Sequence, residues 1–310
     1  MALSPELDPV LDHLAGRIAR GQLVVLVGAG ASRWAGLPTW KEVVCTLAEE
    51  LAPALREAVP GAARRFAPPS PEDPLLSVDV FMKISEAFRW VCGEERLHQR
   101  IRALFDARVT RGELPLHRLL VRLSEHVPAI YTTNFDDLLE RAFAAAGKPY
   151  QVVAEARDLH EWRHDEIDGR FVPRFPIYKL HGSLERPQTI VLGESDFQRR
   201  QGLASHPIDL RFCSDVVGRE VLLIGYSFSD PNVRWLWTKL RDLDVLPVAY
   251  FLELGASSDL DVAYFLKDRV YRVDLNASDR DRPKELLDFL EALLQRCVPP
   301  SPVRSSPRRA

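Results

Sequence analysis

Small and polar residues follow an apolar, β-branched run early in the chain, in an order that suits phosphate binding. The run ends in Gly28, Ala29, Gly30 and Ser32. Glycine has no Cβ, so the backbone can turn sharply there and come close to a ligand. Backbone N–H groups in such a turn, together with a serine hydroxyl, can bind an anion. The sequence therefore predicts a nucleotide diphosphate on this turn, with a plain strand-to-loop turn as the alternative, because a dinucleotide fingerprint would have glycine where Arg33 stands.

A second polar group follows the apolar run 129–133, whose last residue is Thr133. Asn134 and Asp136 come next, before a helix expected over residues 138–146. Either side chain could be the N-cap of that helix. The carboxyl ends of strands in an open parallel sheet are also where ligands bind, so both a cap and a ligand contact are open at these positions.

A histidine and a second glycine turn follow two later apolar runs. His181 comes after residues 176–180 and before a glycine. Its side chain could transfer a proton near neutral pH, and a purely structural histidine is the alternative. Gly225 and Ser227 follow the run 221–224 and repeat the glycine–serine pattern of the first turn.

Continuous apolar runs predict that a parallel sheet positions these residues. A strand that is buried on both faces shows no polar alternation. We therefore expect an α/β fold with a Rossmann-like parallel sheet of about six strands, flanked by helices. The candidate strands are residues 24–27, 129–133, 177–180, 189–192, 221–224, 248–252 and 270–273.

Residues 41–125 interrupt this pattern with helical periodicity and no polar strand end. We expect them to form a helical insertion, and residues 1–40 and 126–296 to form the nucleotide-binding domain. Residues 297–310 are rich in proline, serine and arginine, which predicts a disordered tail. Exposed faces of the insertion are candidates for self-association or for a partner.

Residues 148–175 are charged and show little periodicity, and they could form a lid over the pocket. Their histidines and carboxylates could suggest a metal, but loose polar clusters in loops are usually solvated, so we expect none. The four cysteines are scattered without a C-x-x-C pair. This spacing argues against a structural zinc and against a disulfide framework.

Composition excludes several other classes of function. The chain has 310 residues and a formal net charge of -3, so no general nucleic-acid-binding field is implied. No apolar stretch approaches the roughly 20 residues that span a bilayer. The first residues have no continuous apolar core of a signal peptide. We therefore expect a cytoplasmic protein that binds neither membrane nor nucleic acid directly.

Taken in order, the four polar strand ends resemble those of the sirtuin (SIR2) family, and most closely its SIR2-like branch in bacterial antiphage defence. The resemblance covers most of residues 20–275 and implies an NAD-binding sheet. Asn134 would orient water or the ribose hydroxyls, Asp136 would bind the nicotinamide carboxamide, and His181 would be the general base. The residues implied in NAD binding are Gly28, Ala29, Gly30, Ser32, Thr133, Gly225 and Ser227.

The sequence departs from the protein-deacylating sirtuins at four places. Their four-cysteine zinc module is missing, since only Cys213 lies in that region, so no zinc is expected. Their Gly-Ile-Pro-Asp-Phe-Arg loop reads Gly-Leu-Pro-Thr-Trp-Lys at residues 36–41, and their Gln-Asn-Ile-Asp begins with Thr133 here. The stretch of chain between Asn134 and His181 is also longer than in the deacylating sirtuins. These departures weaken peptide deacylation and leave NAD cleavage.

The resemblance therefore implies an NAD⁺ hydrolase that cleaves the nicotinamide–ribose bond to give nicotinamide and ADP-ribose, as an antiphage defence effector. The alternatives are an NAD-dependent protein deacylase and a non-catalytic sensor of NAD or ADP-ribose. A free NAD⁺ hydrolase would poison its own cell. We therefore expect gating, either by homo-oligomerisation through residues 41–125 or by a partner such as an ATPase, a helicase or another defence protein.

Overall fold

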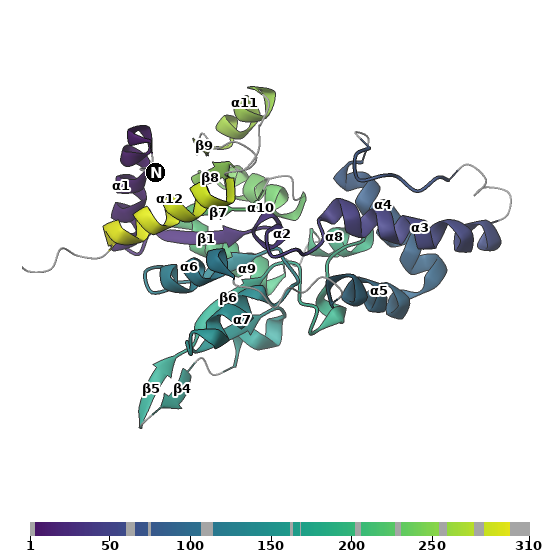
Figure 1. Ribbon diagram of the computed structural model, residues 1–310, viewed down its shortest axis with the longest axis horizontal. Coiled ribbons are helices and arrows are strands. Elements are labelled where there is room, and N and C mark those ends of the chain that lie inside the picture. Colours follow the sequence, from purple (N-terminus) through teal and green to yellow (C-terminus); the bar gives the residue numbers. More distant parts are fainter. Residues whose placement is uncertain are drawn as a thin grey trace, which may run out of the picture.

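Seven parallel strands form the main sheet of the protein (Figure 1). The computed structural model describes residues 4–59, 66–73, 76–106, 114–161, 164–167, 169–201, 206–226, 231–253, 259–275 and 282–297. This sheet confirms the predicted α/β class and has one strand more than about six. In spatial order the strands are β3 (Tyr150–Val153), β6 (Phe175–Lys179), β2 (Ile130–Thr132), β1 (Leu23–Val27), β7 (Glu220–Ile224), β8 (Ala249–Glu253) and β9 (Val270–Asp274).

The register of the central strands brings the predicted polar residues to one edge of the sheet. Every residue of β1 and β7 is buried, as the continuous apolar runs predict. Val27 at the end of β1 lies level with Thr132 of β2 and with Ile224 of β7. The residues that follow these three strands therefore start side by side at the carboxyl edge.

Helices cover both faces of the sheet because alternate residues of each strand point to opposite sides. Val25 and Val27 pack on one face, and Val24 and Leu26 on the other. Helix η1 (Pro5–Leu7) leads into the first layer. That layer holds α1 (Asp8–Ala19), α6 (Pro115–Leu123), α7 (Leu138–Ala145) and α12 (Arg282–Cys297), and the second holds α9 (Pro207–Val217), α10 (Pro231–Asp242) and α11 (Asp259–Lys267).

A separate group of helices lies together at one end of the molecule (Figure 1). Thr39 caps the first of them through a capping box with Glu42, as its position before the apolar pattern predicts. The members of this group are α3 (Trp40–Ala58), α4 (Val78–Cys92) and α5 (Glu94–Asp106), with the short α8 (Glu194–Arg200) packed on α4. Together α3, α4 and α5 form what we call the helical unit.

Helix α6 lies within the expected insertion but packs with the helices of the first layer. Its buried residues, among them Leu116 and Leu120, join the same core cluster as α1 and α12. The division of the chain at residue 125 therefore stays a prediction, and the packing places the end of the helical unit before α6.

Two expectations about single segments are wrong. Residues 189–192 were expected as a strand, but a 3-10 turn, η4 (Pro187–Thr189), leads into a buried segment outside the sheet. Its apolar side chains fill the core beside the helical unit, while the Val191 N–H donates to the carbonyl of His181. Burial without strand pairing produced the same apolar signal as a strand.

The described residues of the charged segment 148–175 form regular structure, and none of them lines the pocket at the carboxyl edge of the sheet. Its first part is strand β3, followed by η3 (Ala156–Leu159). Strands β4 (His164–Ile167) and β5 (Arg170–Pro173) then form an antiparallel hairpin that projects on the opposite side from the helical unit (Figure 1). A lid formed by this hairpin is therefore a wrong expectation.

The expected disordered tail lies outside the described residues, apart from Cys297. Across the ranges that the structure describes, no helix combines the length and the apolar character needed to cross a membrane.

The turns after β1 and β7 touch so closely that a Cβ on Gly28, Gly30 or Gly225 would collide with the backbone of the other turn. The Gly28 N–H donates to the Ile224 carbonyl at 2.9 Å, and the Gly30 N–H donates to the Gly225 carbonyl at 2.8 Å. A Cβ on Gly28 would lie 2.6 Å from that Gly225 oxygen. Gly225 also has a φ of 62°, and a Cβ there would lie 2.3 Å from the Ala31 nitrogen.

This contact predicts that Gly225→Ala destabilises the protein more than the same change at Gly21. Gly21 has a φ of 65° with open space around it, so Gly21→Ala adds only left-handed strain, about 1–2 kcal/mol. Gly225→Ala adds the steric clash, which raises the cost by a further about 1–3 kcal/mol. Urea unfolding of both variants measures the difference, and equal losses would contradict the packing argument.

Candidate functional site

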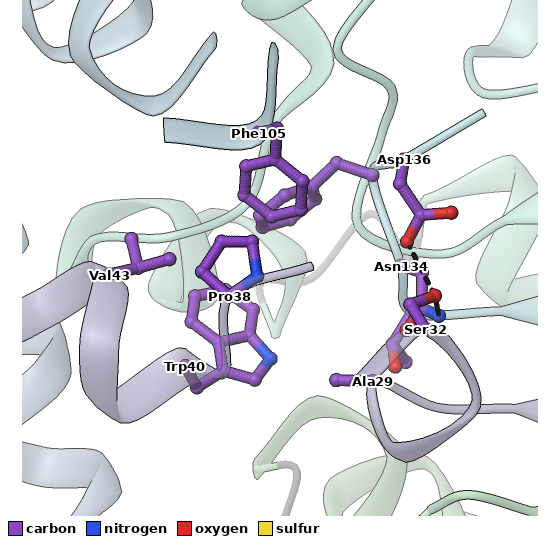
Figure 2. A pocket seen from close by; sticks show the side chains of 10 residues that line it. Ala29, Ser32, Pro38, Trp40, Val43, Phe105, Asn134 and Asp136 are labelled. Carbon is purple, nitrogen blue, oxygen red and sulfur yellow. Dashed lines mark hydrogen bonds between the residues drawn. The ribbon is translucent and has the colours of Figure 1, made fainter. Parts of the chain in front are cut away.

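A pocket opens at the carboxyl edge of the sheet, where the turns after β1 and β2 meet α3 and α5 (Figure 2). It encloses about 350 Å³ of space, part of it open to solvent. Its lining residues are Ala29, Ser32, Pro38, Trp40, Val43, Phe105, Thr133, Asn134, Phe135 and Asp136.

One wall of the pocket is a polar network that joins the first two predicted groups (Figure 2). The Ser32 hydroxyl donates to Asp136 Oδ2 at 2.8 Å and accepts from Asn134 Nδ2 at 2.9 Å. Asn134 Nδ2 also donates to the Gly28 carbonyl at 3.1 Å. The structure thus brings together side chains that lie more than a hundred positions apart in the chain.

The backbone around these side chains supports their orientation. The Asn134 N–H donates to Thr132 Oγ1, and the Leu138 N–H donates to Asp136 Oδ1. The N-cap of α7 is Asp137, so the prediction of Asn134 or Asp136 as the cap is wrong, although Asp136 Oδ1 accepts from the first N–H of the helix. Asp136 also lines the pocket, and its contact with a ligand stays a prediction. Within the described residues, no donor reaches Asn134 Oδ1, which is buried beside the pocket. That oxygen can accept a hydrogen bond from a bound molecule.

The opposite wall is aromatic. The rings of Trp40 and Phe135 meet edge to face with centroids 5.1 Å apart, and Phe105 lies 6.1 Å from Phe135. Pro38 and Val43 extend this apolar surface (Figure 2). A flat ring with one polar substituent matches a pocket that is apolar on one side and hydrogen-bonding on the other.

The glycine turn contributes differently from the sequence expectation. The N–H groups of Gly28 and Gly30 donate to carbonyls at the end of β7, so they are engaged within the protein. Ala29 and Ser32 line the pocket, while Gly225 backs the turn from the neighbouring strand. Ser227 lies outside the described residues.

His181 follows the neighbouring strand β6 but faces a different environment. It is 1% exposed, and its ring meets Phe197 of α8 edge to face, with centroids 5.6 Å apart. The part of the pocket wall that the structure describes does not include this side chain. The structure therefore places His181 at the same edge of the sheet as Asn134, and its catalytic role stays a prediction.

Burial also shapes the electrostatics behind the pocket. His117 of α6 is buried, and this burial lowers its pKa, although the Asp136 carboxylate acts in the opposite direction. Burial therefore disfavours the charged imidazole, while the neighbouring carboxylate favours it. Among the described residues, no three His, Cys, Asp or Glu side chains are grouped so that they could hold a metal ion.

Comparison with known proteins gives this arrangement a family context. Residues 128–270 match the model of the SIR2-like domain. This segment is therefore similar to the SIR2-like domain. The matched segment includes Asn134, Asp136 and His181, and the first glycine turn precedes it.

Curated relatives align with more of the chain than this domain. The NAD(+) hydrolase ThsA of Acinetobacter baumannii is 25% identical over 75% of this chain and 42% of its own length. The ThsA of Bacillus cereus is 23% identical over 78% of this chain and 44% of its own length. Defense-associated sirtuin 2 of Bacillus subtilis is 24% identical over 76% of this chain and 21% of its own length. The chain therefore spans less than half the length of these relatives.

Sequence reasoning missed most of the aromatic wall of the pocket. Phe105 lies on α5 and Val43 on α3, far in the chain from the polar residues that they face. Helical periodicity marks both as apolar positions and contains nothing that distinguishes a pocket wall from ordinary core. Phe135 lies between Asn134 and Asp136 in the chain. This position inside the polar motif is the signal that could have identified Phe135 as a pocket residue.

Ser32→Ala should destabilise the protein by about 1–3 kcal/mol, because a buried Asp136 oxygen loses its donor. Thr46→Ala is a matched control, since the Thr46 hydroxyl bonds only to a carbonyl of its own helix. Its loss should be within about 0.5 kcal/mol. Urea unfolding measures both, and a Ser32 variant as stable as the control would show that the network contributes nothing to folding.

Proposed function

We propose that this protein is an NAD⁺ hydrolase that cleaves the bond between nicotinamide and ribose and releases nicotinamide and ADP-ribose. The observation that carries the proposal is the Ser32–Asn134–Asp136 network facing an aromatic wall at the carboxyl edge of the sheet. The relatives named NAD(+) hydrolase support it.

The pocket fits the nicotinamide end of the substrate. Nicotinamide is a flat ring with a carboxamide, and the pocket offers Trp40 and Phe135 on one side and Asp136 on the other. Asp136 can accept from the carboxamide N–H groups. Asn134 Oδ1 is the buried acceptor available to a ribose hydroxyl or to the attacking water.

The reaction breaks the C–N bond between the ribose and a leaving group that is neutral once released. The ribose passes through an oxocarbenium-like state, and water adds to the same carbon while a base takes its proton. The protein must hold the ribose, shield the cation and position the water. Asn134 is proposed to orient that water or the ribose hydroxyls, and His181 to be the general base.

Nicotinamide release from NAD⁺, without any peptide, tests the proposal directly. Asn134→Ala and His181→Ala should each lose about 10²–10⁴-fold in rate, the usual contribution of a positioned acid–base group. His164→Ala is the control, because that histidine lies on the projecting hairpin. A His181 variant with wild-type rate would remove His181 from the mechanism.

The same assay separates the other classes of function. Release that requires an acyl-peptide would identify a deacylase. Tight NAD⁺ binding without turnover, even after a candidate partner protein is added, would identify a sensor. Either result would contradict hydrolysis of free NAD⁺.

We also propose that activity is gated in an antiphage defence role. The helical unit supplies Trp40 and Phe105 to the pocket, so a contact on its outer face can alter the site. The contact would come from a second copy of the chain or from a partner such as an ATPase, a helicase or another defence protein.

Gating by self-association predicts that the specific activity rises with protein concentration as oligomers form. Light scattering coupled to size-exclusion chromatography gives the oligomer size, and nicotinamide release is measured on the same fractions. Addition of a candidate partner at low protein concentration tests the second route. A monomer that hydrolyses NAD⁺ at full rate would contradict both.

A further inference from the structure

A lysine with no exposed surface lies directly beneath the loop that carries Asn134 and Asp136. Lys179 is the last residue of β6 and is 0% exposed. Its ammonium donates to the Asp136 carbonyl at 2.5 Å and to the Phe135 carbonyl at 3.3 Å. It also pairs with Glu140 Oε1 in the first turn of α7 at 2.5 Å.

All three contacts bind one short stretch of chain. A lysine ammonium has three donors, and here they reach two carbonyls of the loop and the helix that follows it. The Leu184 N–H also donates to the Phe135 carbonyl, at 3.0 Å. Lys179 therefore holds the backbone of the loop through its carbonyls, while Ser32 holds the side chains of Asn134 and Asp136.

Stability alone does not explain a charged pair at this depth. Burial raises the pKa of Glu140, and the Lys179 ammonium acts against that rise. Taking both charges out of water is costly, and well-packed apolar residues in their place are often equally stable. An apolar pair cannot donate hydrogen bonds to the two backbone carbonyls, so it cannot fix the position of the loop relative to β6.

We propose that Lys179 positions the Asn134–Asp136 loop for NAD⁺ cleavage, acting from beneath the pocket without touching the substrate. This inference rests on the proposed function for its effect on turnover. Its structural half, the holding of the loop, can be measured without any reaction. Glu140 accepts from the ammonium and so directs it at the loop.

The test compares K179M/E140M with E140Q. The double variant removes both charges together, which avoids a buried unpaired ion, and it removes the donors to the loop. E140Q keeps Lys179 but leaves its buried ammonium without a charged partner, so it shows what the Glu140 carboxylate contributes. Y131F is the matched control, because it removes a buried hydrogen bond to Asp215 from the adjacent strand β2 without touching the loop.

Hydrogen–deuterium exchange at residues 133–138 and the kcat and KM of nicotinamide release are the two readouts. In K179M/E140M, exchange in this loop should rise about tenfold or more, and kcat should fall about 10- to 100-fold with a smaller change in KM, because small misplacements of reacting groups are costly. Y131F should stay within about threefold of wild type in both readouts, whereas E140Q, which keeps the Lys179 donors, should retain more kcat than K179M/E140M.

Wild-type loop exchange together with wild-type kcat in K179M/E140M would overturn the proposal. Faster exchange with unchanged kcat would overturn its catalytic half. If this variant shows no cooperative unfolding, K179Q/E140Q replaces it with the same criteria. Should the wild type itself release no nicotinamide, the proposed function fails, and loop exchange still decides whether Lys179 holds the loop.

Discussion

The close contact between the turns after β1 and β7 is the constraint on which the rest of the site depends. Gly30 donates to the Gly225 carbonyl at 2.8 Å, and a Cβ on either Gly28 or Gly225 would collide with the other turn. This contact fixes where α2 (Gly30–Arg33) starts, and α2 carries Ser32. The glycines therefore allow the two turns to pack together. The polar side chains that line the pocket are supplied by Ser32 and by the loop that it contacts.

That loop is held from two directions by different kinds of bond. Neutral and charge-assisted hydrogen bonds from Ser32 and Asn134 fix the side chains, while the Lys179 ammonium fixes the backbone. A site on a loop is usually less rigid than one on a strand. Here the loop is only a few residues long and is anchored at both faces, so it can be as well ordered as the strands that end beside it.

The sequence was informative where one physical effect dominated. Continuous apolar runs predicted β1 and β7 because burial on both faces leaves no other pattern. Strand β3 was missed, since its residues alternate between buried and half-buried at the sheet edge. Lys179 was missed for a different reason. A lysine is normally exposed, and only the three-dimensional meeting of β6 with the loop after β2 gives its ammonium three acceptors.

Phe135 links the polar chemistry to the helical unit. It stands between Asn134 and Asp136 in the chain, and its ring belongs to the core cluster of α3, α4 and α5. Protein cores are close-packed, so a helix cannot shift without displacing the side chains that it touches. A shift of α3 or α5 would move Trp40 or Phe105 against this ring and so move the two polar residues beside it. A helical unit that contributes mainly apolar surface to the pocket can therefore still affect the polar residues in it.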